Sequence, residues 1–325
     1  MSNPMITVTD LTKSYDSVKA VNGISFTVGE GELFGFLGPN GAGKTTTINM
    51  LTGLARRDSG TIQIGGLDCS RNPKAAQHLT GIVPDESNLY PELTGFDNLC
   101  FCAALFGVRR REREARARHL LETFDLLNAA DRKFGAYSKG MKRKLTIAAG
   151  IIHQPRILFL DEPTTGIDVA SARQIRQLVA DFHRNGTTIF LTTHYIEEAE
   201  RLCERIAFIV NGQIVREDTV AHLLQPVKSK QAMMFALSGE KQDLINSLGI
   251  AFPHYGFRRE AKGRIRIEAG EVIHIGPLVR FFEEHAIEVN EARRIRPSLE
   301  DVFVEVTGIE PDELKKEKQQ KGGVL

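Results

Sequence analysis

The sequence predicts an α/β fold built around a parallel sheet, followed by a smaller α+β domain. Short apolar segments rich in β-branched residues alternate with longer segments of helical periodicity, which is the pattern of strand–helix–strand units. Residues 225–230, with one proline and two lysines, interrupt this pattern, and the elements that follow have a different order. The length of 325 residues agrees with two domains at about 150 residues each.

The first 224 residues contain most of the expected strands and helices. We expect strands at Met5–Val8, Ile24–Val28, Leu33–Leu37, Thr61–Ile64, Ile157–Leu160, Thr188–Thr192 and Ile206–Val210. We expect helices at Asn98–Leu127, Ser138–Ile152, Val169–Asn185 and Tyr195–Cys203. Ser138 is placed as the N-cap of its helix. Because strand and helix alternate in the second half of this part, its sheet should be parallel.

Residues 230–306 are expected to form a separate accessory domain. The predicted strands are Ala232–Leu237, Ala251–Phe257, Arg264–Glu268 and Ile287–Ile295. The predicted helices are Asp243–Leu248 and Val272–His285. This β-α-β-β-α-β order is typical of a ferredoxin-like module. Residues 307–325 mix charges of both signs, and we expect a frayed tail there.

The composition excludes several classes of protein. Lys and Arg number 42 and Asp and Glu 41, so the formal charge of +1 argues against a nucleic-acid partner. The four cysteines lack the spacing of a disulfide framework or a zinc site. The longest apolar run, Leu99–Val108, is shorter than the roughly 20 residues of a membrane-spanning helix. Since the first residues show no signal-peptide pattern, we expect a protein of the cytoplasm.

A glycine-rich segment lies between the expected strand at 33–37 and a helix. Its residues match the phosphate-binding pattern G-x-x-x-x-G-K-[ST]: Gly38, Pro39, Asn40, Gly41, Ala42, Gly43, Lys44 and Thr45, with Thr46 opening the helix. Glycines let successive N–H groups turn toward a phosphate, and a helix N-terminus adds its dipole. We expect Lys44 to reach the β- and γ-phosphates of a nucleotide and Thr45 to bind Mg²⁺. A plain glycine turn with a surface lysine is the alternative, and the strand–loop–helix context disfavours it.

Polar residues also follow the two buried strands that end at Leu160 and Thr193. Open parallel sheets bind their ligands at the carboxyl ends of such strands. We expect Asp161 to hold Mg²⁺, mostly through water, and Glu162 to act as the base that polarises an attacking water. An acidic pair often only caps a helix, but the phosphate-binding loop favours the catalytic interpretation. His194 is expected to pair with the γ-phosphate, although a single histidine is more often structural.

These elements, in this order and spacing, resemble the ATP-binding cassette (ABC) family, the nucleotide-binding subunits of ABC transporters. The resemblance covers about residues 5–222. It implies a P-loop NTPase core with a parallel sheet, an antiparallel β subdomain and an inserted helical subdomain at about 86–155, all within a nucleotide-binding domain at 1–224. It also implies ATP and Mg²⁺ as cofactors and ATP hydrolysis as the reaction.

The resemblance adds residues that the chemistry alone would not select. Tyr15 matches the family's aromatic residue that stacks on adenine. Ser138 and Gly140 match two positions of the Leu-Ser-Gly-Gly-Gln signature, which faces the γ-phosphate bound to a partner subunit. Asp168 matches a residue that touches that partner. Asp85 stands where the family usually has glutamine; an ionised Asp cannot donate a hydrogen bond but could help to bind Mg²⁺ or water.

In further segments this sequence resembles one subgroup of the family, the type-2 exporter ATPases. That subgroup includes exporters of drugs, sodium, lipids and polysaccharides. The similar segments are the Lys139–Met141 part of the signature, Leu89–Thr94 and Pro297–Phe303. The resemblance implies a peripheral subunit at the cytoplasmic side of the cell membrane that works with a separate integral-membrane permease. Part of Asn88–Val108 would dock that permease. The arginines of 109–118 could touch lipid headgroups, but a solvated charged face is the simpler interpretation.

The signature also implies a second nucleotide-binding subunit, and we expect a homodimer that ATP closes and hydrolysis opens. Residues 230–306 would stabilise that dimer or regulate it. The alternative function is a soluble ABC-type regulator without a permease, a class that usually carries two cassettes or long coiled coils. A GTPase is disfavoured because the chain has no Asn-Lys-x-Asp motif.

Overall fold

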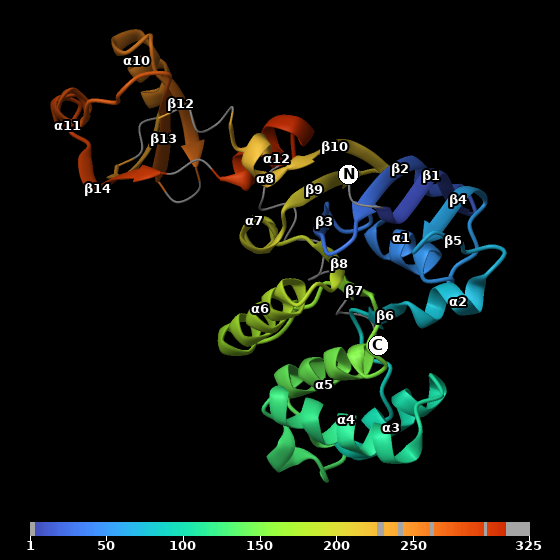
Figure 1. The fold of residues 1–325 in the computed structure, drawn as a ribbon. Coiled ribbons are helices and arrows are strands. Elements are labelled where there is room, and N and C mark those ends of the chain that lie inside the picture. Colours follow the sequence, from blue (N-terminus) through green and yellow to red (C-terminus); the bar gives the residue numbers. More distant parts are fainter. Residues whose placement is uncertain (1–3, 226–230, 240–242, 261–262, 296–297, 310–325) are drawn as a thin grey trace. The chain divides into compact units, whose positions relative to one another are not determined.

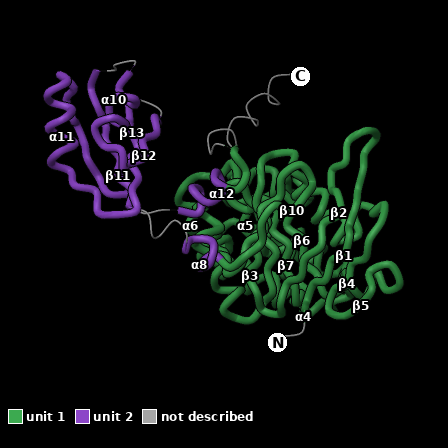
Figure 2. Tube along the Cα trace, turned by 90° about the horizontal axis from the view of Figure 1, so that it is seen from above, with its two compact units in different colours: residues 1–219, 306–325 green, residues 220–305 purple. Residues whose placement is uncertain are grey.

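The chain divides into two units, which Figure 2 shows in green and purple. Unit 1 contains Met1–Thr219 and Val306–Leu325, and unit 2 contains Val220–Glu305. The structure is a computed structural model that describes residues 4–225, 231–239, 243–260, 263–295 and 298–309. Most of the linker expected at 225–230 and of the tail expected at 307–325 therefore lies outside the described residues.

The larger sheet of unit 1 contains the strands that precede the predicted site residues. Its strand order is β10 (Gln213–Thr219), β9 (Arg205–Val210), β3 (Leu33–Leu37), β8 (Thr188–Thr193), β7 (Ile157–Asp161) and β6 (Thr80–Val83). The strands from β9 to β6 are parallel, and β10 pairs antiparallel with β9. Every residue of β3, β7 and β8 is buried, which explains the apolar run in each of these strands. The predicted parallel sheet is confirmed.

A second, antiparallel sheet packs beside the first one (Figure 1). Its strand order is β2 (Val18–Gly29), β1 (Pro4–Tyr15), β4 (Ser59–Ile64) and β5 (Leu67–Asp68). Phe26 of β2 joins the two sheets, because its ring centroid lies 5.8 Å from that of Phe34 and 5.8 Å from that of Phe190. This aromatic contact belongs to the apolar core that the two sheets share.

Four helices of unit 1 flank the strands. They are α1 (Lys44–Leu51), α2 (Pro73–His78), α6 (Val169–Arg184) and α7 (Ile196–Leu202). α1 contacts β2 and β7, and α7 contacts β3 and β8. Each of α1, α6 and α7 starts within a few residues of the carboxyl end of a parallel strand, so loop residues there face one edge of the sheet.

A helical segment separates β6 from β7 in the sequence, and Figure 1 shows its helices gathered together. It consists of α3 (Gly95–Leu105), α4 (Arg110–Thr123), the 3₁₀ turns η1 (Leu127–Ala129) and η2 (Phe134–Ala136), and α5 (Lys139–Ile151). Ser138 is the N-cap of α5, and its side chain accepts a hydrogen bond from the Met141 N–H, as expected. The predicted single helix at Asn98–Leu127 is wrong, since α3 and α4 are separate. Gly107 lies between them with φ of +76°, a conformation that glycine allows and that ends a helix.

Unit 2 has a four-stranded antiparallel sheet in the order β12-β13-β11-β14 within its described residues. Its elements are α8 (Val220–Leu223), β11 (Gln231–Ser238), α10 (Leu244–Ala251), β12 (Gly256–Glu260), β13 (Arg264–Ala269), α11 (Ile275–Glu284), β14 (Glu288–Ile295) and the start of α12 (Leu299–Thr307). From β11 to β14 the order is β-α-β-β-α-β, as the sequence predicts. The assignment to the ferredoxin-like class stays a prediction.

One strand of unit 2 was expected in the wrong place. Ala251–Phe257 was predicted as a strand, but Ala251 is the last residue of α10 and β12 begins only at Gly256. The reason is packing, because Leu244, Leu248 and Phe252 recur every four residues and all belong to one apolar core. The sequence analysis also gave no helix for the segment that forms α12.

Across the ranges that the structure describes, no helix combines the length and the apolar character needed to span a membrane.

Candidate functional site

The glycine-rich loop joins β3 to α1 and lies tightly against two other strands. A β-carbon at Gly38 would lie 2.1 Å from the carbonyl oxygen of Ile209, and one at Gly43 would lie 2.3 Å from that of Ala20. Gly43 also has φ of +106°, which L side chains rarely adopt. The loop can therefore follow this path only because both positions lack a side chain, as the phosphate-binding pattern requires.

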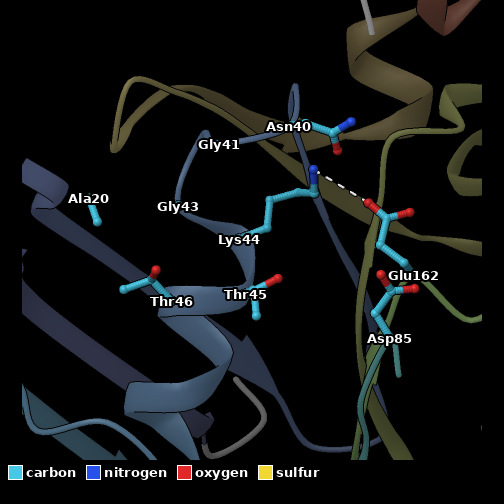
Figure 3. A pocket seen from close by; sticks show the side chains of 9 residues that line it. All are labelled: Ala20, Asn40, Gly41, Gly43, Lys44, Thr45, Thr46, Asp85 and Glu162. Carbon is cyan, nitrogen blue, oxygen red and sulfur yellow. Dashed lines mark ion pairs between the residues drawn. The ribbon is translucent and has the colours of Figure 1, made fainter. Parts of the chain in front are cut away.

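Lys44 lies inside this loop with only 6% of its surface exposed. Its Nζ donates hydrogen bonds to the carbonyl oxygens of Gly38, at 2.7 Å, and Pro39, at 3.1 Å. The same nitrogen is 3.4 Å from Oε1 of Glu162, as Figure 3 shows. These contacts place a positive charge in a cavity of about 170 Å³. The cavity is lined by Ala20, Asn40, Gly41, Gly43, Lys44, Thr45, Thr46, Asp85 and Glu162.

Thr45 and Asp161 provide oxygen atoms next to this cavity. The Thr45 hydroxyl donates a 2.8 Å hydrogen bond to Oδ2 of Asp161, and the Thr192 hydroxyl donates to Oδ1. Burial raises the pKa of the Asp161 carboxyl, although both hydroxyl contacts oppose that shift. A hydroxyl and two carboxylates, with Asp85 as the second, are the kinds of ligand that Mg²⁺ prefers. The residues therefore fit a magnesium ion.

Glu162 follows β7 and lies between the side chains of Lys44 and His194. Its Oε2 is 2.7 Å from Nδ1 of His194, and it also accepts a 3.0 Å hydrogen bond from the Thr165 hydroxyl. Burial raises the pKa of the Glu162 carboxyl, but the hydrogen bond with His194 and the charge of Lys44 outweigh burial and lower it overall. Glu162 is thus an ionised carboxylate within the site. Its φ of +50° is unusual for a residue with a side chain.

The signature residues form a second, separate place in the same unit. Ser138 and Asp168 are exposed N-caps of α5 and α6. Hydrogen bonds from the Ser171 side chain and N–H lower the pKa of Asp168. Gly140 brings the two helices together, since a β-carbon there would lie 2.3 Å from Oγ of Ser171. Among the described residues, neither Ser138, Gly140 nor Asp168 lines the cavity beside Lys44.

Tyr15 lies at the end of β1, five residues before Ala20, which does line the cavity. Its side chain is 48% exposed, and the Lys13 ammonium lies 5.2 Å from its ring centroid. The structure thus brings Lys44, Thr45 and Glu162 together, whereas the exposed Tyr15 ring is not among the described residues that line the cavity.

Two buried charged residues near the site were missed in the sequence analysis. Arg143, on α5, and Glu198, on α7, are 6% and 4% exposed. Glu198 accepts hydrogen bonds from the hydroxyls of Thr164, at 2.9 Å, and Thr193, at 3.3 Å, and burial raises its pKa. The available signal for Arg143 was its position, because it follows Gly140 and precedes Ile147 at helical spacing on the buried face of α5.

Comparison with known proteins identifies the family. A family model described as ABC transporter matches residues 21–165. The chain is 34% identical over 307 residues to a linearmycin resistance ATP-binding protein of Bacillus subtilis, covering 94% of this chain and 98% of that protein. This chain belongs to the ABC transporter family. As an ABC-family ATPase subunit it binds ATP, and the predicted resemblance is confirmed.

Other members of the ABC family support the same conclusion. A Nod factor export ATP-binding protein of Burkholderia orbicola is 41% identical over 225 residues, which are 69% of this chain and 74% of that protein. A solved dimeric ATP-binding cassette in a post-hydrolysis state, bound to ADP and Pi, has a TM-score of 0.62 at 26% identity. That similarity covers 66% of this chain and 99% of the solved one. The predicted P-loop NTPase fold with its two kinds of sheet is thus confirmed for the ABC part.

Proposed function

We propose that this chain is the ATP-hydrolysing subunit of an exporter, which acts on a separate integral-membrane permease at the cytoplasmic side of the cell membrane. The observation that carries the proposal is the cluster of Lys44, Glu162 and His194 next to the Thr45–Asp161 pair. Such a set provides a cation for phosphate, ligands for a metal ion and a carboxylate for water. The two curated relatives are named for antibiotic resistance and for export, which supports an exporter over the alternative of a regulator without a permease.

The loop and Lys44 would bind the phosphates of ATP. The N–H groups at the start of α1 and the positive end of its dipole favour an anion there. Lys44 already lies in the cavity, with its charge directed at Glu162 (Figure 3). Because Glu162 and a γ-phosphate would compete for Lys44, phosphate binding would free the carboxylate from that ion pair.

Thr45, Asp161 and Asp85 would hold Mg²⁺. A bound Mg²⁺ neutralises charge that develops on the β- and γ-phosphate oxygens. In this chain, Asp161 is held in place by hydroxyl contacts on both of its carboxylate oxygens. Asp85 would contribute a carboxylate where the family usually has the neutral amide of glutamine.

Glu162 would orient the attacking water and accept its proton. A carboxylate in this role must be ionised and fixed in direction, and the contacts of Glu162 with His194 and Thr165 provide both. His194 would pair with the γ-phosphate and keep Glu162 directed toward the site. Tyr15 would stack on adenine, since its ring is exposed and its strand pairs with β2, which contributes Ala20 to the cavity.

Ser138, Gly140 and Asp168 would act on ATP bound to a second nucleotide-binding subunit, and we propose a homodimer. These residues are apart from the cavity that Lys44 lines, and Ser138 is exposed at the N-terminus of α5, where the positive end of the helix dipole favours an anion. Two copies placed head to tail would bring each signature to the other's ATP. ATP would favour the closed dimer, and hydrolysis would remove that preference.

The permease would dock on the groove next to α3. A cavity of about 470 Å³ is lined there by residues of α2, α3, α5 and β6 and of the segments that flank them. Its lining includes Leu54, Leu105, Phe106 and His153. Leu54 and Leu105 are 67% and 69% exposed and line the same groove, and exposed apolar side chains grouped in this way mark interaction sites. The Phe106 ring stacks on that of His153, with centroids 3.5 Å apart. An apolar groove of this kind suits an amphipathic helix of a partner.

We keep the domain division proposed from the sequence: a nucleotide-binding domain at 1–224 with a helical subdomain at about 86–155, an accessory domain at 230–306 and a tail at 307–325. The accessory domain would stabilise the dimer or regulate ATP hydrolysis. No nucleic acid is expected as a partner, because charges of both signs balance along the chain.

The test of this proposal is the mass in solution of Glu162→Gln, measured by light scattering with and without Mg-ATP. Glutamine should leave ATP binding intact while removing the base, so the variant should shift from monomer to dimer when Mg-ATP is added. Co-purification of the dimer with a membrane protein would then support the permease. Rapid ATP turnover by Glu162→Gln would contradict the role of Glu162.

A further inference from the structure

Arg143 has a buried guanidinium whose hydrogen bonds go to the main chain of two segments that contribute Asp85 and Glu162 to the nucleotide cavity. It lies on α5 and is 6% exposed. Its Nε donates to the carbonyl oxygen of Pro163 at 2.9 Å, and its Nη2 donates to that of Asp161 at 2.6 Å. Its Nη1 donates to the carbonyl oxygen of Asp85 at 3.1 Å and also to that of Pro84.

Two of these carbonyls belong to the residues immediately before and after Glu162. Glu162 has φ of +50°, in a region that costs about 1 kcal/mol or more for a residue with a side chain. Such a conformation persists only when the surrounding contacts determine it. By holding the carbonyls of Asp161 and Pro163 with one planar group, Arg143 fixes the backbone from which the Glu162 side chain extends into the cavity.

The other two carbonyls belong to the segment that follows β6. Asp85 lines the same cavity as Lys44 and Glu162, and it follows β6, the strand that pairs with β7. One guanidinium therefore sets the distance between the backbone of Asp85 and that of Glu162. Ser138, the N-cap of the same helix, lies five positions before Arg143. A displacement of α5 at Ser138 would therefore also move the backbone segments of Asp85 and Glu162 that Arg143 binds.

We propose that Arg143 is a positioning residue for ATP hydrolysis, which holds the main chain of Glu162 and Asp85 in register with the signature helix α5. The inference rests on the proposed role of Glu162. Only arginine suits the place, because its five N–H donors lie in one plane and point in different directions. The lysine ammonium is a single centre that cannot reach carbonyls on both sides.

The first experiment compares Arg143→Lys with the wild type in steady-state ATP hydrolysis by the full chain. A backbone displacement at Glu162 should lower kcat by about 100-fold, the effect of roughly 1 Å of misplacement. KM for ATP should change by less than about threefold, because the phosphate-binding loop has no contact with the substituted side chain in the described structure.

Arg116→Lys is the matched control. Arg116 also donates from its guanidinium to a main-chain oxygen, that of Ile152 just past α5, at 3.0 Å, and is also partly buried. Arg116 lies on α4, and the oxygen that it binds is at the opposite end of α5 from Ser138. Its kcat should stay within about twofold of the wild type. An equal loss of kcat in both variants would mean that any weakening of α5 has this effect, and the inference would be wrong.

Chemical rescue separates positioning from a general loss of stability. Arg143→Ala leaves a space for a guanidinium ion, so millimolar guanidinium should restore part of kcat with saturation, whereas equal concentrations of urea or sodium chloride should not. If Arg143→Ala does not fold, Arg143→Gln takes its place in a double-variant experiment. Because Arg143 acts through Glu162, the variant that carries both Arg143→Gln and Glu162→Gln should have a kcat no lower than that of Glu162→Gln alone.

Failure of the inference and failure of the proposed function give different results. If Glu162→Gln hydrolyses ATP like the wild type, the role of Glu162 is wrong whatever Arg143 does. If Glu162→Gln is inactive while Arg143→Lys keeps the wild-type kcat, the positioning role of Arg143 is overturned.

Discussion

The Nδ1 atom of His194 lies 2.7 Å from Oε2 of Glu162, and the two side chains are 7% and 6% exposed. At this burial the hydrogen bond both directs the carboxylate and keeps it ionised. His194→Ala should therefore lower kcat for ATP by about 100-fold while ATP binding persists. Steady-state hydrolysis and nucleotide titration by fluorescence check this. His183→Ala is the control, because His183 also pairs with a glutamate but is partly exposed on α6. A fall in kcat of the same size for both variants would contradict the specific role of His194.

The ionisation of Glu162 predicts how stability depends on pH. The pKa of its carboxyl in the folded chain lies below the ordinary value of 4.5. At pH values between the two, the unfolded chain binds more protons, so the stability that Glu162 contributes rises with pH in that window. It is fully present above pH 4.5 and is lost as pH falls through the lowered pKa. Urea unfolding of the wild type and Glu162→Gln should therefore differ less below this window than at pH 6. A constant difference across the range would contradict the lowered pKa.

Gly43 is predicted to tolerate no side chain. Its φ of +106° is unfavourable for alanine, and a β-carbon would lie 2.3 Å from the Ala20 carbonyl oxygen. Gly43→Ala should lower the free energy of unfolding by about 2–3 kcal/mol and remove ATP binding. Gly66→Ala is the matched control, since Gly66 has φ of +78° with nothing within 4 Å. It should cost only about 1 kcal/mol and leave ATP binding unchanged. Thermal unfolding and nucleotide titration distinguish the two, and equal losses would show that the close approach to Ala20 is unimportant.

Ser138 should matter more for turnover than for ATP binding by one chain. Ser138→Ala removes the N-cap hydrogen bond to Met141, which costs about 1 kcal/mol of stability, and it also removes a hydroxyl offered to the second subunit. Thr94→Ala removes the same kind of cap from α3, where the Thr94 side chain accepts from the Asp97 N–H. We expect reduced turnover and ATP-dependent dimerisation for Ser138→Ala alone. Similar turnover in both variants would mean that Ser138 serves only as a helix cap and has no role at the second subunit.

Leu105 should be required for binding the permease but not for binding ATP. It is 69% exposed and lines the groove next to α3. Leu105→Asp places a charge in an apolar groove, so co-purification with the membrane partner should be lost while ATP binding by the isolated chain is unchanged. Leu127→Asp is the control, because Leu127 is 49% exposed in the same helical segment but does not line the groove. Loss of co-purification in both would mean that the whole segment had been disturbed.

The ATP-binding part of the fold could be predicted from the sequence because short-range patterns determine it. Lys44 and Thr45 belong to one contiguous motif, and Asp161 and Glu162 directly follow a run of buried residues, so their meeting at one sheet edge follows from parallel pairing. Ser138 could be predicted as a helix N-cap because serine is one of the residues preferred at that position.

The remaining features depend on contacts between distant segments. The helix break at Gly107 left little sign in an apolar run that continues to Val108. The residues around Phe252 suit a strand as well as the end of a helix. Only the packing of Phe252 in the same apolar core as Leu248 determines that the helix continues to this point. Helical spacing places Arg143 on the buried face of α5, but the partners of Arg143 and Glu198 could not be derived from local sequence. A charged residue is buried only where distant carbonyls or hydroxyls complete its hydrogen bonds.

The stack of Phe106 on His153 makes the groove observable by spectroscopy. The chain contains no tryptophan, so Phe106→Trp would introduce a single indole fluorophore at the wall of the groove. Burial lowers the pKa of the His153 imidazole, so this ring would be neutral near pH 7 and charged only in acid. The introduced indole would thus lie next to a neutral imidazole near pH 7. Since a protonated imidazole quenches indole emission far more than a neutral one, the emission of this one residue would report the solvent and charge surroundings of the groove while a partner binds.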